Sequence, residues 1–281
     1  MNYHLSSKEF ILIAKYIKDH CGIEIPQEKS YLIENRLSRL LSDFNLSGFE
    51  ELYARIAGHR DADIEEKVID AITTNETFWF RDQSPWDILE NKLLPGYIDE
   101  IRKGKRTKVR IWSAACSTGQ EPYSTAMCID NYLTMKGIHD IDSSKFEILA
   151  TDISNNVLKT ARAGQYDNIS VMRGLDESYR QKYFTYSGGF WKLSDGIVSA
   201  VRFQQFNLLN SALLLGKFDI VFCRYVLIYF SEGLKRNILE KIHTVLEDGG
   251  VLFIGNSELM AESHHLFQKV KEDSNIYYIK R

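Results

Sequence analysis

The sequence lacks the patterns of several common kinds of site. Its four cysteines stand apart, with no C-x-x-C pair and no histidines at metal-ligand spacing, so we predict neither a zinc site nor a disulfide framework. No G-x-G-x-x-G follows an apolar run, which counts heavily against an oxidoreductase that binds a dinucleotide. We therefore expect chemistry that needs no metal and no nicotinamide cofactor.

Long apolar runs and a strong charge of one sign are also missing. The most apolar stretch, residues 218–230, contains Asp219 and Arg224 and is too short to cross a bilayer. The first ten residues lack the apolar core of a signal peptide, so we expect a cytoplasmic protein that does not insert into a membrane. A net charge of -3 provides no overall field for nucleic acid, and we predict no such partner.

What is present first is a helical pattern. Ser6 and Glu9 form a capping box, apolar residues follow at helical spacing, and Gly22 stands where a C-terminal cap belongs. A second helix is predicted from Pro26, in its first turn, to the Asn45 region, followed by helices over 49–56 and 64–72. We predict a small all-helical domain over residues 1–80.

From about residue 108, short runs rich in Val, Ile and Phe alternate with helical segments. Such near-continuous apolar strands are typical of a parallel sheet covered on both faces, so residues 81–281 are predicted to be a doubly wound α/β domain. Gly188-Gly189 and Asp195-Gly196 look like turns between short antiparallel strands, which predicts a β-insertion at about 165–200. The predicted sheet strands are 109–114, 146–151, 201–206, 218–223 and 251–255, with a final pair near 267–270 and 276–279.

A ligand site is predicted where the first strand ends. Small residues at 114–119 lead into a helix opened by Pro122, the place where doubly wound sheets bind ligands. Glu121 would repel a pyrophosphate, so a cofactor with a positive centre fits better, and S-adenosylmethionine has a sulfonium, an ammonium and a ribose diol. Asp152, ending the second strand, is placed to accept hydrogen bonds from that ribose; the alternative is a helix N-cap for the segment that begins at Ser154.

The sequence resembles the CheR family of chemotaxis receptor methyltransferases. The order and spacing of the matching segments agree over nearly the whole chain, which implies a Rossmann-like class I methyltransferase domain. The segments that carry the resemblance are TTNETFWFR (73–81), WSAACSTGQEPYS (112–124), FNLL (206–209), FDIVFCRYVLIYF (218–230) and VLFIGNSE (251–258).

The resemblance also implies the roles of individual residues. Two departures from the family pattern are Tyr225, where Asn is usual, and Gln120, where Glu is common. The residues that would line the pocket of S-adenosylmethionine and the methyl-transfer region are Asn75, Thr77, Arg81, Glu121, Asp152, Asn207, Leu208, Tyr225 and Val226.

The implied reaction is methylation of glutamate side chains on chemotaxis receptors. A glutamate carboxylate, with a pKa near 4.3, is ionised at neutral pH, so no general base is needed. Arg81 and Tyr229 are the candidates for positioning the reacting groups. For Arg81 the alternative is a surface ion pair with Asp82 or Glu76, and for Tyr229 it is simple packing.

Lys29, Arg36 and Arg39 are candidates for docking the acidic, helical region of a receptor. The resemblance suggests this role, whereas charge counting alone allows an ordinary solvated helix face. We expect the enzyme to be a monomer. Two alternatives stay open: a signalling module that binds S-adenosylmethionine but methylates weakly or not at all, and a methyltransferase for another carboxylate.

Overall fold

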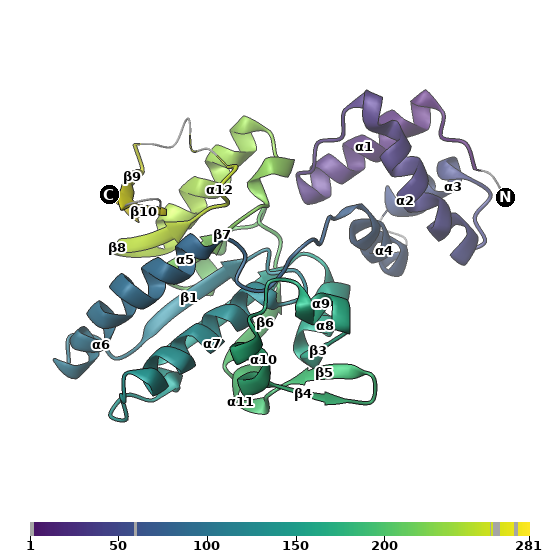
Figure 1. Ribbon diagram of the computed structural model, residues 1–281. Helices are drawn as coiled ribbons and strands as arrows, with labels where there is room; N and C mark the ends of the chain where they lie inside the picture. The colour runs from purple at the N-terminus through teal and green to yellow at the C-terminus, as the bar shows by residue number, and fades with distance from the viewer. Residues whose placement is uncertain (1–2, 59–60, 259, 261–264, 273–274) are drawn as a thin grey trace.

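The computed structural model describes residues 3–58, 61–258, 260, 265–272 and 275–281. Figure 1 shows a helical unit set beside a larger α/β domain, with a small sheet projecting from the α/β domain. The described residues include no helix long and apolar enough to cross a membrane. The three parts agree with the fold class predicted from the sequence.

The helical unit packs around its own apolar core. The predicted capping box of Ser6 and Glu9 is present, and Gly22 ends the first helix at φ 76°, as predicted. Ile13, Ile33 and Leu37 are fully buried in this core. The elements of the unit are α1 (Ser7–Cys21), η1 (Gln27–Lys29), α2 (Ser30–Asp43), α3 (Phe49–Ile56) and α4 (Ala62–Ile72).

The second helix begins later than predicted. Pro26 precedes a short 3-10 turn, η1, and α2 starts only at Ser30. Lys29 is the residue before α2, so it does not share a helix with Arg36 and Arg39. Backbone geometry explains the difference, because a proline that favours the first turn of a helix suits a 3-10 turn equally well.

The main sheet has the strand order β6-β2-β1-β7-β8-β10-β9. The first five strands of this order run parallel, while β10 is antiparallel to both of its neighbours. The parallel sheet predicted from the apolar runs is therefore confirmed for five strands, with an antiparallel pair closing one edge. Strand bounds are β1 (Val109–Ala114), β2 (Phe146–Asp152), β6 (Val201–Gln205), β7 (Phe218–Cys223), β8 (Leu246–Phe253), β9 (Phe267–Glu272) and β10 (Asn275–Lys280).

Helices cover both faces of the sheet. Ile111, Ile148 and Ile220 point to a core shared with α5–α7, whereas Trp112 and Val221 point to the opposite core, shared with α12. This alternation along each strand places helices on the two sides seen in Figure 1. The covering helices and turns are α5 (Gln83–Ile88), η2 (Leu89–Leu93), α6 (Leu94–Arg102), α7 (Gln120–Met135), η3 (Ser143–Lys145), α8 (Asn155–Ala163), η4 (Ala212–Leu215), η5 (Leu227–Tyr229) and α12 (Glu232–Val245).

The predicted insertion is a three-stranded antiparallel sheet of order β3-β5-β4 with short helices. Gly188 and Gly189 form the turn between β4 and β5, both with positive φ. The predicted turn at Asp195-Gly196 is wrong, because Asp195 starts α11 after Ser194. The elements of the insertion are β3 (Gln165–Tyr166), α9 (Asn168–Met172), α10 (Glu177–Tyr183), β4 (Phe184–Ser187), β5 (Phe190–Leu193) and α11 (Asp195–Ser199).

Candidate active site

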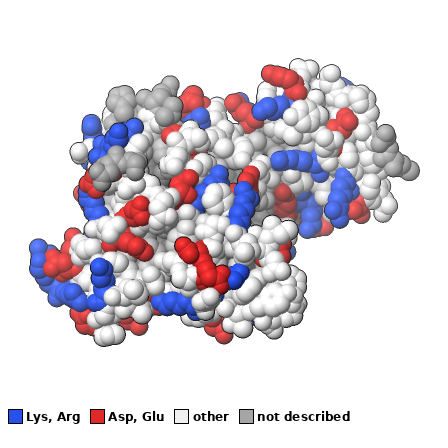
Figure 2. Space-filling model, in the orientation of Figure 1, with Lys and Arg blue, Asp and Glu red and all other residues white. Residues whose placement is uncertain are grey.

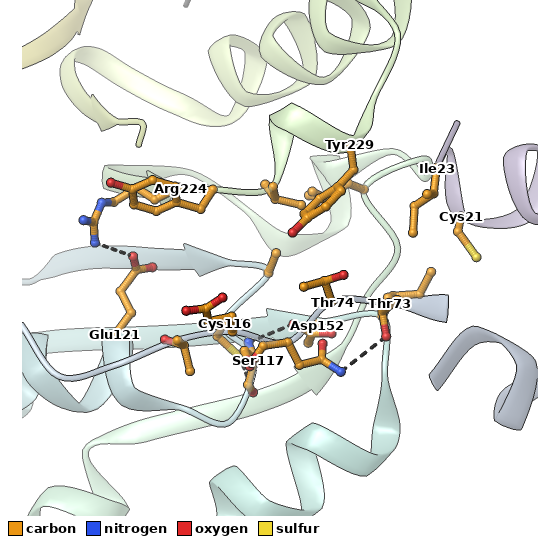
Figure 3. Close-up of a pocket in the computed structure, with 18 of the residues that line it drawn as sticks. Cys21, Ile23, Thr73, Thr74, Cys116, Ser117, Glu121, Asp152, Arg224 and Tyr229 are labelled. Carbon is orange, nitrogen blue, oxygen red and sulfur yellow. Dashed lines mark hydrogen bonds and ion pairs between the residues drawn. The ribbon is translucent and has the colours of Figure 1, made fainter. Parts of the chain in front are cut away.

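A pocket lies where the carboxyl ends of β1, β2 and β7 meet the helical unit (Figure 3). The empty space between the residues that line it is about 980 Å³ when the open solvent at its mouth is included. All ten residues predicted to bind the cofactor or to position the reacting groups line it. These are Asn75, Thr77, Arg81, Glu121, Asp152, Asn207, Leu208, Tyr225, Val226 and Tyr229.

The turn after β1 forms the floor of the pocket. Ala115 and Ser117 both have positive φ, at 60° and 51°, a sharp bend that turns the backbone N–H of Ser117 toward β2. That N–H donates to a carboxylate oxygen of Asp152 at 2.8 Å, and the N–H of Ser154 donates to the other oxygen at 3.0 Å. Asp152 is thus fixed at the end of its strand.

Asp152 is not a helix cap. Ser154 caps α8 with its own hydroxyl, which accepts from the N–H of Val157, so the alternative considered for Asp152 is wrong. Burial raises the pKa of Asp152 above its usual value, against the hydrogen bonds it accepts from backbone N–H groups. Each carboxylate oxygen retains a lone pair for a further donor.

Glu121 stands in the first turn of α7 and faces a buried arginine. Its two oxygens accept from Ser113 Oγ at 2.7 Å and from Arg224 at 2.9 Å. The Arg224 side chain is only 2% exposed, and it also pairs with Asp82 at 2.8 Å. Its Nε is buried without a hydrogen-bond partner among the described residues. Two carboxylates therefore balance one buried guanidinium at this wall.

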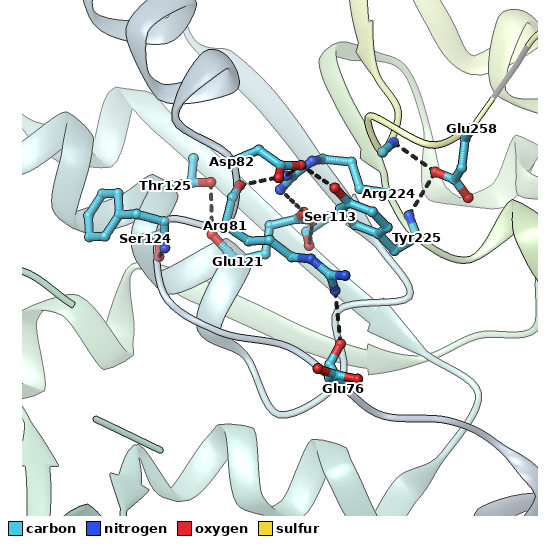
Figure 4. Close-up of polar contacts among 12 residues, drawn as sticks. Glu76, Arg81, Asp82, Ser113, Glu121, Ser124, Thr125, Arg224, Tyr225 and Glu258 are labelled. Atoms are coloured by element: carbon cyan, nitrogen blue, oxygen red, sulfur yellow. Dashed lines mark hydrogen bonds and ion pairs between the residues drawn. The ribbon is translucent and has the colours of Figure 1, made fainter. Parts of the chain in front are cut away.

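The alternative considered for Arg81, a surface ion pair with Asp82 or Glu76, is wrong. The Arg81 guanidinium donates to the backbone carbonyl of Glu76 at 3.1 Å and lies over the ring of Tyr225 (Figure 4). It also lies over the ring of Phe78. Asp82, the other carboxylate considered as a partner, accepts hydrogen bonds from Arg224 and from the Tyr225 hydroxyl instead. Within the described part of the chain, Arg81 forms no ion pair with a carboxylate.

A buried glutamate outside the pocket accepts hydrogen bonds from the loop that closes it. Glu258 accepts from the backbone N–H groups of Tyr225 at 2.7 Å, Gly255 at 2.7 Å and Ile228 at 3.3 Å. Tyr225 itself has φ 58°, a conformation that an L-residue with a bulky side chain rarely adopts. Three backbone bonds to one carboxylate stabilise that turn.

The helical unit supplies another wall of the pocket. Cys21 and Ile23 line it from the end of α1, and burial raises the pKa of the Cys21 thiol to about 12, so this cysteine is an apolar wall residue. Asn207, from the opposite side, donates to the carbonyl of His20 at 2.7 Å. The Glu24 N–H donates to the carbonyl of Tyr229 at 3.2 Å.

The three predicted docking residues lie outside the pocket, and Arg36 and Arg39 have different contacts. Arg39 is 88% exposed in its side chain and pairs with Asp43 at 3.6 Å. Arg36 instead donates to the carbonyl of Ile72 and, at 3.1 Å, to the Thr74 hydroxyl, which lines the pocket. In Figure 2, basic side chains gather on the lower part of the helical unit in this view, with acidic ones among them.

Several pocket residues escaped the sequence analysis. Arg224 carried a signal, since a charge inside an apolar run is costly unless it is paired. Its partner Asp82, which does not line the pocket, carried none. Cys21 and Ile23 carried none, because only the packing of the helical unit brings them to the pocket. Glu258 supports the pocket loop from outside the pocket and lay inside a recognised segment, but its donors Tyr225 and Ile228 are far away in the sequence.

The lining suits S-adenosylmethionine. Glu121 and Asp152 would repel a phosphate and match an ammonium or sulfonium and a ribose diol, while Arg81 offers a cation to a carboxylate. The apolar side chains of Ile23 and Leu208 offer a surface for a flat base. No cluster of metal-ligating side chains occurs in the described residues.

Comparison with known proteins agrees with this geometry. Residues 75–276 match the family described as CheR methyltransferase, SAM binding domain, and residues 8–73 match CheR methyltransferase, all-alpha domain. The chemotaxis protein methyltransferase Cher2 of Pseudomonas putida is 41% identical over 264 residues, covering 94% of each chain. Chemotaxis protein methyltransferase 1 of Pseudomonas aeruginosa is 41% identical over 274 residues, covering 97% of this chain and 98% of that protein.

More distant relatives extend over the same length. The chemotaxis protein methyltransferase of Borreliella burgdorferi is 33% identical over 269 residues, covering 95% of this chain and 93% of that protein. Two family matches that together span the helical unit and the α/β domain, with relatives aligned almost end to end, leave one assignment. The chain belongs to the CheR methyltransferase family and is an S-adenosylmethionine-dependent methyltransferase of chemotaxis.

Proposed function

We propose that this enzyme esterifies glutamate side chains in the cytoplasmic region of chemotaxis receptors. The observation that carries the proposal is Arg81, a pocket cation without a carboxylate partner among the described residues, in a protein of the CheR family. A cation held in this way suits an anionic group, either the carboxylate of the cofactor or the incoming glutamate. The relatives named as chemotaxis protein methyltransferases support the receptor as substrate.

The cofactor would be held by residues from five segments of the chain. We assign the ribose hydroxyls to Asp152, the ammonium to Glu121 and the adenine to the loop of Asn207 and Leu208. Val226 closes the pocket beside them, and Asn75 and Thr77 line the other side. When bound, S-adenosylmethionine supplies a methyl group on a positively charged sulfur.

The protein's own contribution is orientation and exclusion of water. Because the glutamate is already ionised, no residue has to remove a proton from it. Arg81 would orient a carboxylate, and the Tyr229 side chain points into the pocket in Figure 3, where it could contact the acceptor. Partial desolvation between these side chains raises the reactivity of the carboxylate toward the methyl group.

Receptor docking is assigned to the exposed basic side chains of the helical unit. Arg39 and Lys29 stand on its surface, whereas Arg36 is engaged with the loop that leads into the pocket. We expect the enzyme to act as a monomer in the cytoplasm, where the methylated region of such receptors lies.

The test is transfer of a tritiated methyl group to cytoplasmic fragments of chemotaxis receptors. We expect a rate that is nearly flat from about pH 6.5 to 8.5, since the acceptor carboxylate is ionised throughout. The product should release volatile methanol in mild base, as a methyl ester does. A label that survives base, or a rate that climbs steadily with pH, would point to an amine or thiol acceptor and refute the glutamate assignment. Cofactor binding without transfer to any fragment would favour a non-catalytic signalling module.

A further inference from the structure

The guanidinium of Arg81 lies between two aromatic rings. Its Cζ is 3.5 Å from the ring centroid of Tyr225 and 5.0 Å from that of Phe78. The face of an aromatic ring attracts a cation through its quadrupole, but it does not neutralise the charge as a carboxylate would. The two rings therefore hold Arg81 in place while its positive charge stays available.

The carboxylates nearest to Arg81 in sequence are engaged elsewhere. Glu76 offers Arg81 only its backbone carbonyl, and its carboxylate pairs with another arginine. Asp82 accepts from Arg224 at 2.8 Å and from the Tyr225 hydroxyl at 2.5 Å. One tyrosine thus contacts Arg81 through its ring and binds, through its hydroxyl, the carboxylate that would otherwise compete for Arg81.

The position of the Tyr225 ring is built into the fold. Its backbone at φ 58° is held by the bond from its N–H to Glu258. A side chain at Gly255 would bring a Cβ to 2.8 Å from Glu258 Oε2 and 2.9 Å from Tyr225 Cδ1, distances that real Cβ atoms essentially never show. Only a glycine at this position leaves room for the ring.

We propose that Tyr225 is a positioning residue that keeps the guanidinium of Arg81 aimed at an anionic group in the pocket. The proposal rests on the function proposed above for Arg81. It assigns a purpose to a side chain whose ring and hydroxyl both contact charged groups at the pocket wall. It also explains why a strained backbone conformation is kept at a bulky residue.

The test is a double-mutant cycle between Tyr225→Leu and Arg81→Met, with kcat and KM measured for methyl transfer to a receptor fragment. We expect Tyr225→Leu to lower kcat/KM about tenfold, the scale of a partly desolvated cation–π contact. Tyr225→Phe keeps the ring and should lose only about threefold. In the Arg81→Met background, Tyr225→Leu should have no further effect, because the group it positions is gone.

Two more variants separate positioning from stability. Asn adopts positive φ more readily than Leu, so Tyr225→Asn should melt at a higher temperature than Tyr225→Leu, yet lose as much activity. Gly255→Ala would displace both the ring and the Glu258 carboxylate, so it should lose at least as much kcat/KM as Tyr225→Leu. The control is Tyr97→Leu on α6. It removes the contact between the Tyr97 ring and the Arg106 guanidinium (5.0 Å) and should leave kcat/KM unchanged.

The outcomes that overturn the proposal are specific. Equal losses from Tyr225→Leu with and without Arg81 would show that the ring does not act through Arg81. Activity that follows melting temperature across the Tyr225 variants would show a merely structural role. If Arg81→Met itself kept full activity, the proposed role of Arg81 would fail, which is a different result from additivity.

Discussion

Asp152 shows how a single residue links strand geometry to ligand binding. It ends β2, is nearly fully buried, and accepts two backbone hydrogen bonds, one per oxygen. Burial raises its pKa because the charged form loses water that the backbone bonds only partly replace. A ligand that donates hydrogen bonds to the carboxylate would favour the charged form.

We expect Asp152→Ala to weaken the binding of S-adenosylhomocysteine by roughly 1.5–3 kcal/mol, the scale for hydrogen bonds to a charged group. Isothermal titration measures this loss directly. Affinity of the wild type should be full well above the raised pKa of Asp152 and should fall as the pH drops through it, because protonation removes an acceptor. A wild-type affinity independent of pH, with an unchanged dissociation constant in the variant, would remove Asp152 from the site.

At the scale of elements, the pocket loop between β7 and α12 depends on a residue outside the pocket. The loop carries Arg224, Tyr225 and the turn η5. The backbone N–H groups of Tyr225 and Ile228 donate to Glu258. Glu258 follows β8, the neighbouring strand of the sheet. Two adjacent strand ends therefore hold one loop through a single carboxylate.

Glu258→Ala should lower the free energy of unfolding by roughly 2–4 kcal/mol, because it leaves three backbone N–H groups without their acceptor. It should also weaken cofactor binding, since Tyr225 and Val226 line the pocket. Urea unfolding and calorimetric titration measure the two effects. Glu247→Ala, at an exposed position of β8, is the control and should change stability by less than about 0.5 kcal/mol. Equal stability of the two variants would contradict the role of Glu258.

Helix α2 carries two arginines with different partners, so their substitutions should separate docking from cofactor binding. Reversal of the exposed Arg39 to Glu should slow methylation of a receptor fragment roughly threefold to tenfold at low salt and less at high salt. The dissociation constant for S-adenosylhomocysteine should not change. Lys269→Glu, the same charge change on the exposed edge strand β9, is the control.

Arg36→Met should instead weaken cofactor binding, because Arg36 holds the carbonyl of Ile72 and the hydroxyl of Thr74 at the pocket. Loss of cofactor affinity on reversal of Arg39, or an equal rate loss on reversal of Lys269, would refute docking through the exposed face of α2.

At the scale of the whole molecule, two units with separate apolar cores share one pocket. The helical unit packs around its own cluster, yet it contributes Cys21 and Ile23 to the pocket wall. Polar bonds cross the junction, among them Ser154 Oγ to Asp70 at 2.5 Å and Asn207 to the carbonyl of His20. A ligand in this pocket contacts both units.

We expect S-adenosylhomocysteine to stabilise both units together. At about one hundred times its dissociation constant it should add about 2.7 kcal/mol and raise the melting temperature by roughly 5–10 °C. Differential scanning calorimetry should show one transition that moves as a whole. A separate, earlier transition that does not respond to the ligand would show that the helical unit is not part of the binding site.

The sequence by itself determined the local structure and the identity of the central site residues. Capping at Ser6, the left-handed Gly22 and the apolar runs of the strands follow from short-range sterics and hydrogen bonding, which act within a few residues. The motif residues around Asp152 and Glu121 were found for the same reason, because strand ends and helix starts can be located along the chain.

Only the tertiary structure decided which distant groups meet. Nothing near Arg36 in sequence indicates that it binds the carbonyl of Ile72, and nothing near Glu258 indicates three backbone donors. For this reason Arg36 is not available to the docking face that the family resemblance implied. A long side chain can reach many partners, so its partner depends on how α2 and α4 pack and on which strands lie side by side. Those arrangements result from burying apolar surface over the whole chain, a nondirectional effect that leaves no local pattern to read.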